Sequence, residues 1–109
     1  MYLEQFKNNE DIIREYGAPA DALDGADVLL AWYGYGSYSG DSFVLFKKDG
    51  KLFENHGGHC SCYGLEGQWE PEETTVEALA RRKIDDYGSY DGGADAQAEL
   101  NKVLAELAA

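Results

Sequence analysis

The sequence predicts an α+β fold, with a small antiparallel sheet of three to four strands arranged as a meander, one helix before it and two helices after it. Three observations predict this fold. Apolar residues recur at helical spacing near both ends of the chain, β-branched and aromatic residues dominate residues 27–56, and the Asp-Gly pair at 49–50 is typical of a tight hairpin turn. At 109 residues the chain is expected to form a single domain, residues 1–109.

The first helix is expected within residues 1–17, because apolar residues there fall close to one helical face and Gly17 follows them. These apolar residues are Leu3, Phe6, Ile13 and Tyr16. Asn8 or Asn9 could instead cap a shorter helix that begins at Glu10.

The expected strands are Asp27–Tyr35, Ser42–Lys48 and Lys51–His56. Asp49 and Gly50 suit a type I′ turn, which needs positive φ at both central residues. A turn of this length sets the register of the hairpin. The predicted pairs are Lys48–Lys51, Phe46–Phe53 and Phe43–His56. Residues 62–69 could form a fourth strand or an ordered loop, and Gly34–Gly40 is expected to be a hairpin loop that displays Tyr35 and Tyr38.

Two helices are expected after Pro71. Thr74 and Glu77 have the spacing of a capping box for the first, which would run to Gly88. Asp95 is expected to cap the last. With all helices on one face of the sheet, the other face would be free. It would display some of Trp32, Tyr33, Tyr35 and Tyr38.

The formal net charge is −12, and the surplus acid lies toward the two ends of the chain. Residues 1–27 hold seven acids and two bases, residues 28–62 hold three of each, and residues 63–109 hold eleven acids and four bases. Such a surface repels nucleic acid, ATP-like ligands and anionic membranes, and it attracts proteins with a basic surface. Acidity also aids solubility on its own. We expect the surplus carboxylates to cluster on one outward-facing side.

Both histidines and both cysteines lie in one short stretch, NHGGHCSCY. The residues that could hold zinc are His56, His59, Cys60 and Cys62. Their spacing differs from the paired ligands of most structural zinc sites, because all four would come from seven consecutive residues. A glycine-kinked loop without a metal is the main alternative, and no other cofactor is expected.

A reactive thiol is a second possibility in this stretch, with Cys60 as nucleophile and His56 as base. The acidic surroundings tend to raise the pKa of a thiol, which disfavours reactivity, and no oxyanion hole is evident. We therefore predict that the protein is not an enzyme. One residue separates the two cysteines, so both are expected to be reduced. No leader-like segment and no apolar run of about 18 residues is visible, so a cytoplasmic location is expected.

The strings HCSCYGLEGQWEPEE (His59–Glu73) and DSFVLFKKDGKLFE (Asp41–Glu54) resemble small proteins of tailed phages and prophages. The resemblance covers about residues 28–80 and implies no particular catalytic or binding residue. It does imply a setting, the cytoplasm of an infected or lysogenic bacterium, where small acidic proteins often bind a host protein.

The leading functional hypothesis is therefore an inhibitor of a host protein that handles nucleic acid, similar to anti-CRISPR or anti-restriction proteins that mimic nucleic acid. Carboxylates and tyrosines are expected to make the contacts. The candidate partner-binding residues are Tyr33, Tyr35, Tyr38, Glu70, Glu72, Glu73, Asp85 and Asp86. The alternatives are a zinc- or thiol-dependent module built on the HGGHCSC loop and a structural or accessory phage protein.

Overall fold

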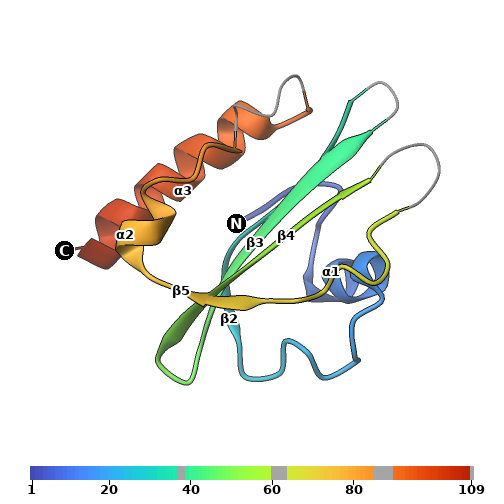
Figure 1. The fold of residues 1–109 in the computed structure, drawn as a ribbon, viewed down its shortest axis with the longest axis horizontal. Helices are drawn as coiled ribbons and strands as arrows, with labels where there is room; N and C mark the ends of the chain where they lie inside the picture. The colour runs from blue at the N-terminus through green and yellow to red at the C-terminus, as the bar shows by residue number, and fades with distance from the viewer. Residues whose placement is uncertain (37–38, 60–63, 85–89, 109) are drawn as a thin grey trace.

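The computed structural model describes residues 1–36, 39–59, 64–84 and 90–108 and shows an α+β fold (Figure 1). The elements in chain order are β1 (Tyr2–Glu4), α1 (Asn9–Tyr16), β2 (Asp27–Tyr35), β3 (Gly40–Lys48), β4 (Lys51–His59), β5 (Glu72–Thr74), α2 (Val76–Leu79) and α3 (Gly93–Ala108). The five strands form one sheet in the order β1-β2-β3-β4-β5. The sheet is mixed, because β1 pairs in parallel with β2 whereas the other pairs are antiparallel. It is thus larger than the predicted meander of three to four strands.

The central hairpins match the sequence prediction closely. Strand β2 has the predicted bounds, and β3 and β4 each extend beyond theirs, to Gly40 and His59. Asp49 and Gly50 have φ of 54° and 77°, as a type I′ turn requires. All three predicted cross-strand pairs are confirmed, including the stacked rings of Phe46 and Phe53. The two-residue turn therefore determines the register of the longest strand pair.

The N-terminal segment begins as a strand, so the prediction of one helix within residues 1–17 is wrong at its start. Strand β1 forms its backbone hydrogen bonds with β2, which lies more than 20 residues away in the sequence. No pattern within the first residues of the chain indicates such a pairing. The shorter helix that the sequence offered as an alternative is present as α1. The Asn8 side chain caps it by accepting a hydrogen bond from the backbone N–H of Asp11 at 2.9 Å. Gly17 ends it in the left-handed conformation with φ of 63°.

Replacing Asn8 by alanine is expected to lower the free energy of unfolding by about 1 kcal/mol, because the cap of α1 is lost. Asn8→Ser keeps an oxygen that can accept the same hydrogen bond, so its loss should stay within a few tenths of a kcal/mol. Urea denaturation of both variants measures the difference. Equal losses would show that the side chain does not act as a cap.

The helices after the sheet differ from prediction at their starts. Helix α2 is a single turn capped by Thr75, not Thr74, whose side chain accepts from Ala78 N–H at 3.1 Å. Helix α3 begins at Gly93, two residues before the predicted cap Asp95. The first of these helices ends at Leu79, so the prediction that it runs to Gly88 is wrong: residues 80–84 are described and are not α-helical, and only 85–89 lie outside the described residues. Among the described residues, no helix is both long and apolar enough to cross a membrane.

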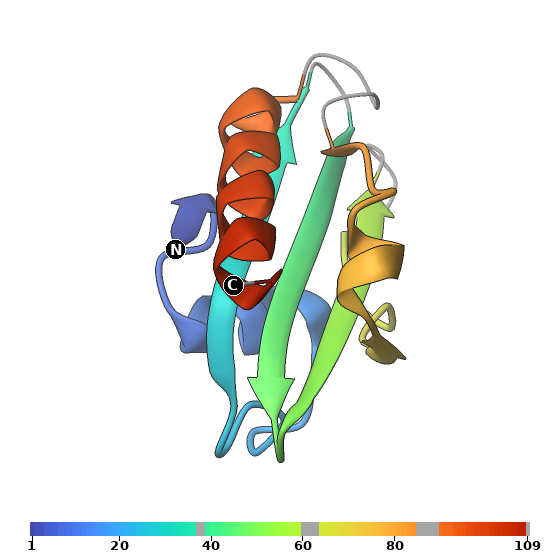
Figure 2. The same ribbon diagram turned by 90° about the vertical axis from the view of Figure 1, so that its left-hand side faces the viewer.

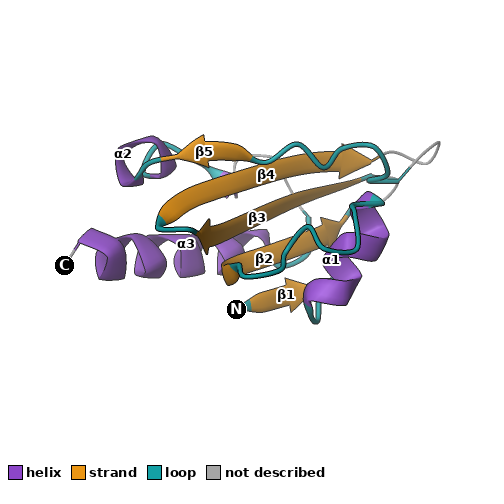
Figure 3. Ribbon diagram, turned by 90° about the horizontal axis from the view of Figure 1, so that it is seen from below, coloured by secondary structure: helices purple, strands orange, loops and turns teal. Residues whose placement is uncertain are grey.

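Helices cover both faces of the sheet, so the prediction of one free face is wrong (Figures 2 and 3). The α1-side core includes Phe6, Ile12, Tyr16, Ala31, Tyr33, Val44 and Leu65. The α3-side core includes Leu30, Trp32, Phe43, Leu45, Leu79, Ile84 and Leu100. Consecutive residues of β2 alternate between these cores, and both sets are apolar. A strand that is apolar on both sides requires cover on both sides.

Candidate functional site

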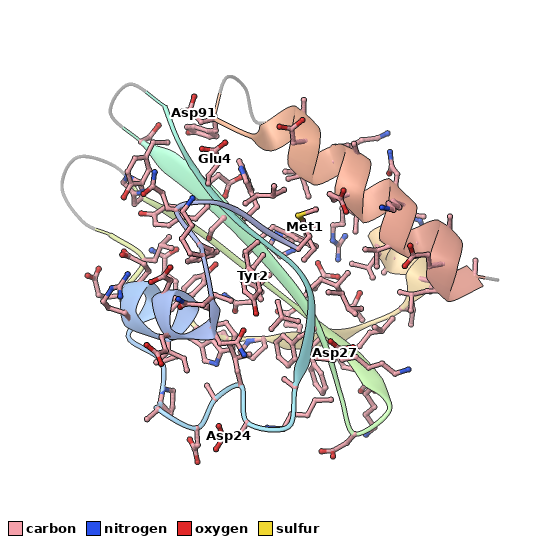
Figure 4. All side chains as sticks on the ribbon, turned by 180° about the vertical axis from the view of Figure 1, so that it is seen from behind. Met1, Tyr2, Glu4, Asp24, Asp27 and Asp91 are labelled. Atoms are coloured by element: carbon pink, nitrogen blue, oxygen red, sulfur yellow. The ribbon has the colours of Figure 1, made fainter. Side chains whose placement is uncertain are left out.

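The exposed carboxylates do not gather on one side, so this expectation is wrong. Figure 4 shows Asp24 and Asp27 at one end of the sheet and Glu4 and Asp91 at the other. Further exposed or half-exposed acids lie on α1 and along α3, on opposite faces of the sheet. Net charge alone therefore does not define a binding surface, and a local concentration of charge has to be sought.

The densest run of exposed acids follows the edge of the sheet at β5. We call it the acidic edge, made of Glu66, Glu70, Glu72, Glu73 and Glu77, all exposed. Among the described residues, none of these five carboxylates forms an ion pair within 4.0 Å. Strand β5 has a neighbour on one side only, and charges on such an edge also discourage pairing with other chains. Three of the predicted contact residues thus lie here, whereas Asp85 and Asp86 lie outside the described residues.

The three predicted tyrosine contacts have different positions. Tyr33 is 2% exposed in the α1-side core, so it cannot be a surface anchor. Tyr35 is 40% exposed at the end of β2, and Tyr38 lies outside the described residues. Tyr33 and Tyr35 are two residues apart on β2 and therefore lie on the same side of the sheet, which α1 unexpectedly covers. Tyr35 is the last residue of the strand and lies at the margin of this cover, so it stays exposed whereas Tyr33 is buried.

The rings of Tyr33, Tyr35 and His59 pack edge-to-face, with centroids 5.1–5.4 Å apart. They meet because Gly40 lies between Tyr35 and His59 in the register; a Cβ there would come within 2.4 Å of the His59 ring. The Tyr33 hydroxyl and His59 Nδ1 form a hydrogen bond of 2.7 Å. Burial raises the pKa of Tyr33, and the neighbouring Tyr35 raises it further. Packing thus fixes the position of the exposed Tyr35 ring.

Glu66 of the acidic edge acts electrostatically on Tyr33, the buried neighbour of Tyr35. Carboxylates of Glu15, at the end of α1, and Glu66 contribute to the raised pKa of Tyr33. The Glu66 side chain also lies beside Gly17, the C-cap of α1.

The carboxylate of Glu54 is buried on the α3 side of the sheet, with 4% of the residue exposed. It accepts hydrogen bonds from Arg82 Nε at 2.7 Å and Nη2 at 3.0 Å, and from His56 Nε2 at 2.5 Å. Burial alone would raise its pKa, but the hydrogen bonds from His56 and Arg82 outweigh burial and lower the pKa to about 2. We call Glu54, His56 and Arg82 the Glu54 cluster, and the sequence analysis did not identify it. One signal was present: Glu54 lies two positions from Leu52 and therefore points to the same, core-facing side of β4.

Two hollows adjoin this cluster. One, of about 290 Å³, lies between the α3-side face of β3 and β4 and the segment after α2. The other, of about 550 Å³, lies at the acidic edge, where Glu70 and Glu72 contribute to its wall. His56 and Arg82 line both, so the Glu54 cluster stands between the two hollows.

The outer edge of β4 beyond β5 is closed by side chains. The Gln68 amide accepts from Gly58 N–H at 2.9 Å and donates to Gly58 C=O at 2.8 Å, as a paired strand would. Asn55 accepts from Glu70 N–H at 2.8 Å. These contacts hold the chain that carries the acidic edge against β4, and sequence reasoning did not identify either residue.

The predicted metal and thiol sites are only partly described. His56 and His59 lie three residues apart on β4 and therefore point to opposite faces, toward Phe43 and Tyr33 respectively. They do not converge on one ion in this strand, whereas Cys60 and Cys62 lie outside the described residues. Within residues 1–36, 39–59, 64–84 and 90–108, no group of three His, Cys, Asp or Glu side chains could hold a metal ion. The pairing of His56 with Phe43, by contrast, follows the predicted register.

Comparison of the chain with protein-family models, with curated proteins and with solved structures found no match.

Proposed function

We propose that this is a phage-type binding protein that docks its acidic edge onto a basic surface of a host protein and thereby inhibits it. The target would be a protein that handles nucleic acid, such as a CRISPR effector or a restriction complex, in the cytoplasm of an infected or lysogenic bacterium. The acidic edge would occupy the place of phosphates.

The observation that carries this proposal is the run of five exposed glutamates within residues 66–77, none of which has an ion-pair partner among the described residues. The edge is held to β4 by β5 pairing and by Asn55 and Gln68, so its carboxylates are carried on a fixed backbone. A preorganised surface loses less entropy on binding than a mobile tail. Tyr35 supplies an exposed aromatic ring on which an arginine of the partner would stack.

The proposal predicts that a partner captured from a bacterial lysate is basic and binds less tightly as salt rises. With the purified partner, raising sodium chloride from about 50 to 300 mM should weaken binding at least about tenfold, because screening weakens the attraction. The partner's own DNA or RNA should compete with the protein for it. Affinity that is insensitive to salt, or a ternary complex with nucleic acid, would contradict mimicry.

A further inference from the structure

The smaller of the two hollows has a charge opposite to that of the whole protein. Three of the nine lysines and arginines of the chain, Arg81, Arg82 and Lys83, line this cleft of about 290 Å³ together with His56. Trp32 and Phe43 form an apolar floor, each 1% exposed. Cations above an apolar, water-poor surface interact with an anion more strongly than cations in open solvent.

The cationic segment is fixed at both ends. Leu79 before it and Ile84 after it are buried in the α3-side core. The Ile84 N–H donates to Gln97 of α3 at 2.6 Å, and the Arg82 N–H donates to Leu79 C=O at 3.0 Å. The chain between these anchors is therefore held over the cleft before any ligand arrives.

The charges of the cleft are not balanced within the described residues. Glu54 holds Arg82 through two hydrogen bonds. Asp41 is the carboxylate that lines the cleft; it accepts from Ser42 N–H at 2.9 Å, and burial raises its pKa. Arg81 and Lys83 are exposed, and neither forms an ion pair with a described residue. These two side chains can turn toward an anion in the cleft.

We propose that this cleft binds a small organic anion that carries a phosphate or carboxylate group on a planar or apolar body. Arg81 and Lys83 hold the anionic group, and the body lies toward Phe43 and His56. A volume of about 290 Å³ is at the lower end for ligand pockets, which suits a molecule with one ring. This site is separate from the acidic edge and does not depend on the proposed function.

Phenyl phosphate, inorganic phosphate and phenol are the probes for the test, added to the full chain and followed by NMR. Phenyl phosphate should produce saturable shifts at Phe43, His56 and Ile84 and bind at least about tenfold more tightly than either other probe, since each lacks one half of the recognised structure. Arg81→Ala combined with Lys83→Ala should weaken phenyl phosphate at least about tenfold.

The matched control is Lys47→Ala combined with Lys51→Ala, which removes the same charge from the far hairpin and should change affinity less than about twofold. Melting temperatures establish that both double variants fold. Absence of saturable shifts, equal weakening in both variants, or equal affinity for phenyl phosphate and inorganic phosphate would overturn the proposal.

Discussion

Replacing Glu54 by alanine is expected to lower the free energy of unfolding by about 2 to 3 kcal/mol. The substitution removes the acceptor of two hydrogen bonds from Arg82 and one from His56. The Arg82 side chain is 39% exposed, so it can regain part of its hydration, and the loss falls below that of a fully buried pair. Urea denaturation at pH 7 measures the change.

Glu72→Ala is the matched control, because Glu72 pairs directly with Glu54 in the register but is exposed. Its effect should stay within about 0.5 kcal/mol. If the two variants lose the same free energy, Glu54 does not act as the buried partner of Arg82.

The lowered pKa of Glu54 leads us to expect that the free energy of unfolding depends on pH. The pKa of Glu54 is about 2 in the folded protein, against an ordinary value of 4.5. A pKa that is lower in the folded state stabilises the fold fully above pH 4.5, and this contribution disappears as pH falls toward 2. The difference in unfolding free energy between the wild type and Glu54→Gln should therefore shrink across that window. A difference that stays constant would contradict the assignment.

Alanine at position 34 is expected to destabilise the protein by about 3 kcal/mol, the upper part of the range for overpacked cores. An added Cβ would lie 2.2 Å from the Asp91 carbonyl oxygen and 2.7 Å from the Trp32 ring. That oxygen also accepts from Trp32 Nε1 at 2.8 Å, and the Asp91 N–H donates to Tyr35 C=O at 3.0 Å. The segment before α3 therefore cannot move away without losing both bonds.

Gly58→Ala provides the comparison, because its nearest contact would be an ordinary 3.4 Å. Its loss should be below about 1 kcal/mol, measured by the same denaturation. Similar stabilities for the two variants would show that β2 and the Asp91 segment tolerate a wider separation.

What the sequence predicts well is local. The Asp49-Gly50 turn sets the pairing of Phe43 with His56, thirteen residues apart, because each step of an antiparallel ladder follows from the previous one. Strand β1 was missed because three residues that pair with a distant strand carry no periodic signal. The cover on both faces, by contrast, was readable from β2, where Leu30, Ala31, Trp32 and Tyr33 leave no polar side.

The candidate site was predictable only in part. Glu70, Glu72 and Glu73 of the acidic edge flank Pro71, and charged side chains in such a run are usually exposed, so their exposure was predictable. Tyr33 was misplaced because its face of the strand depends on where α1 packs. The contact between Glu54 and Arg82 joins residues 28 positions apart, and no spacing rule connects them. The cationic cleft depends on the same long-range contact.

The most direct test of the proposed function compares two charge reversals against one purified partner at low salt. The first replaces Glu70, Glu72 and Glu73 of the acidic edge by lysine. The second replaces three other exposed acids by lysine, Asp21 and Asp24 of the loop before β2 and Asp27 at the start of β2, and so makes the same change in net charge. If the acidic edge is the contact, the first should weaken binding about 100-fold and the second less than about threefold. Equal weakening by both would mean that net charge, and not the acidic edge, accounts for binding.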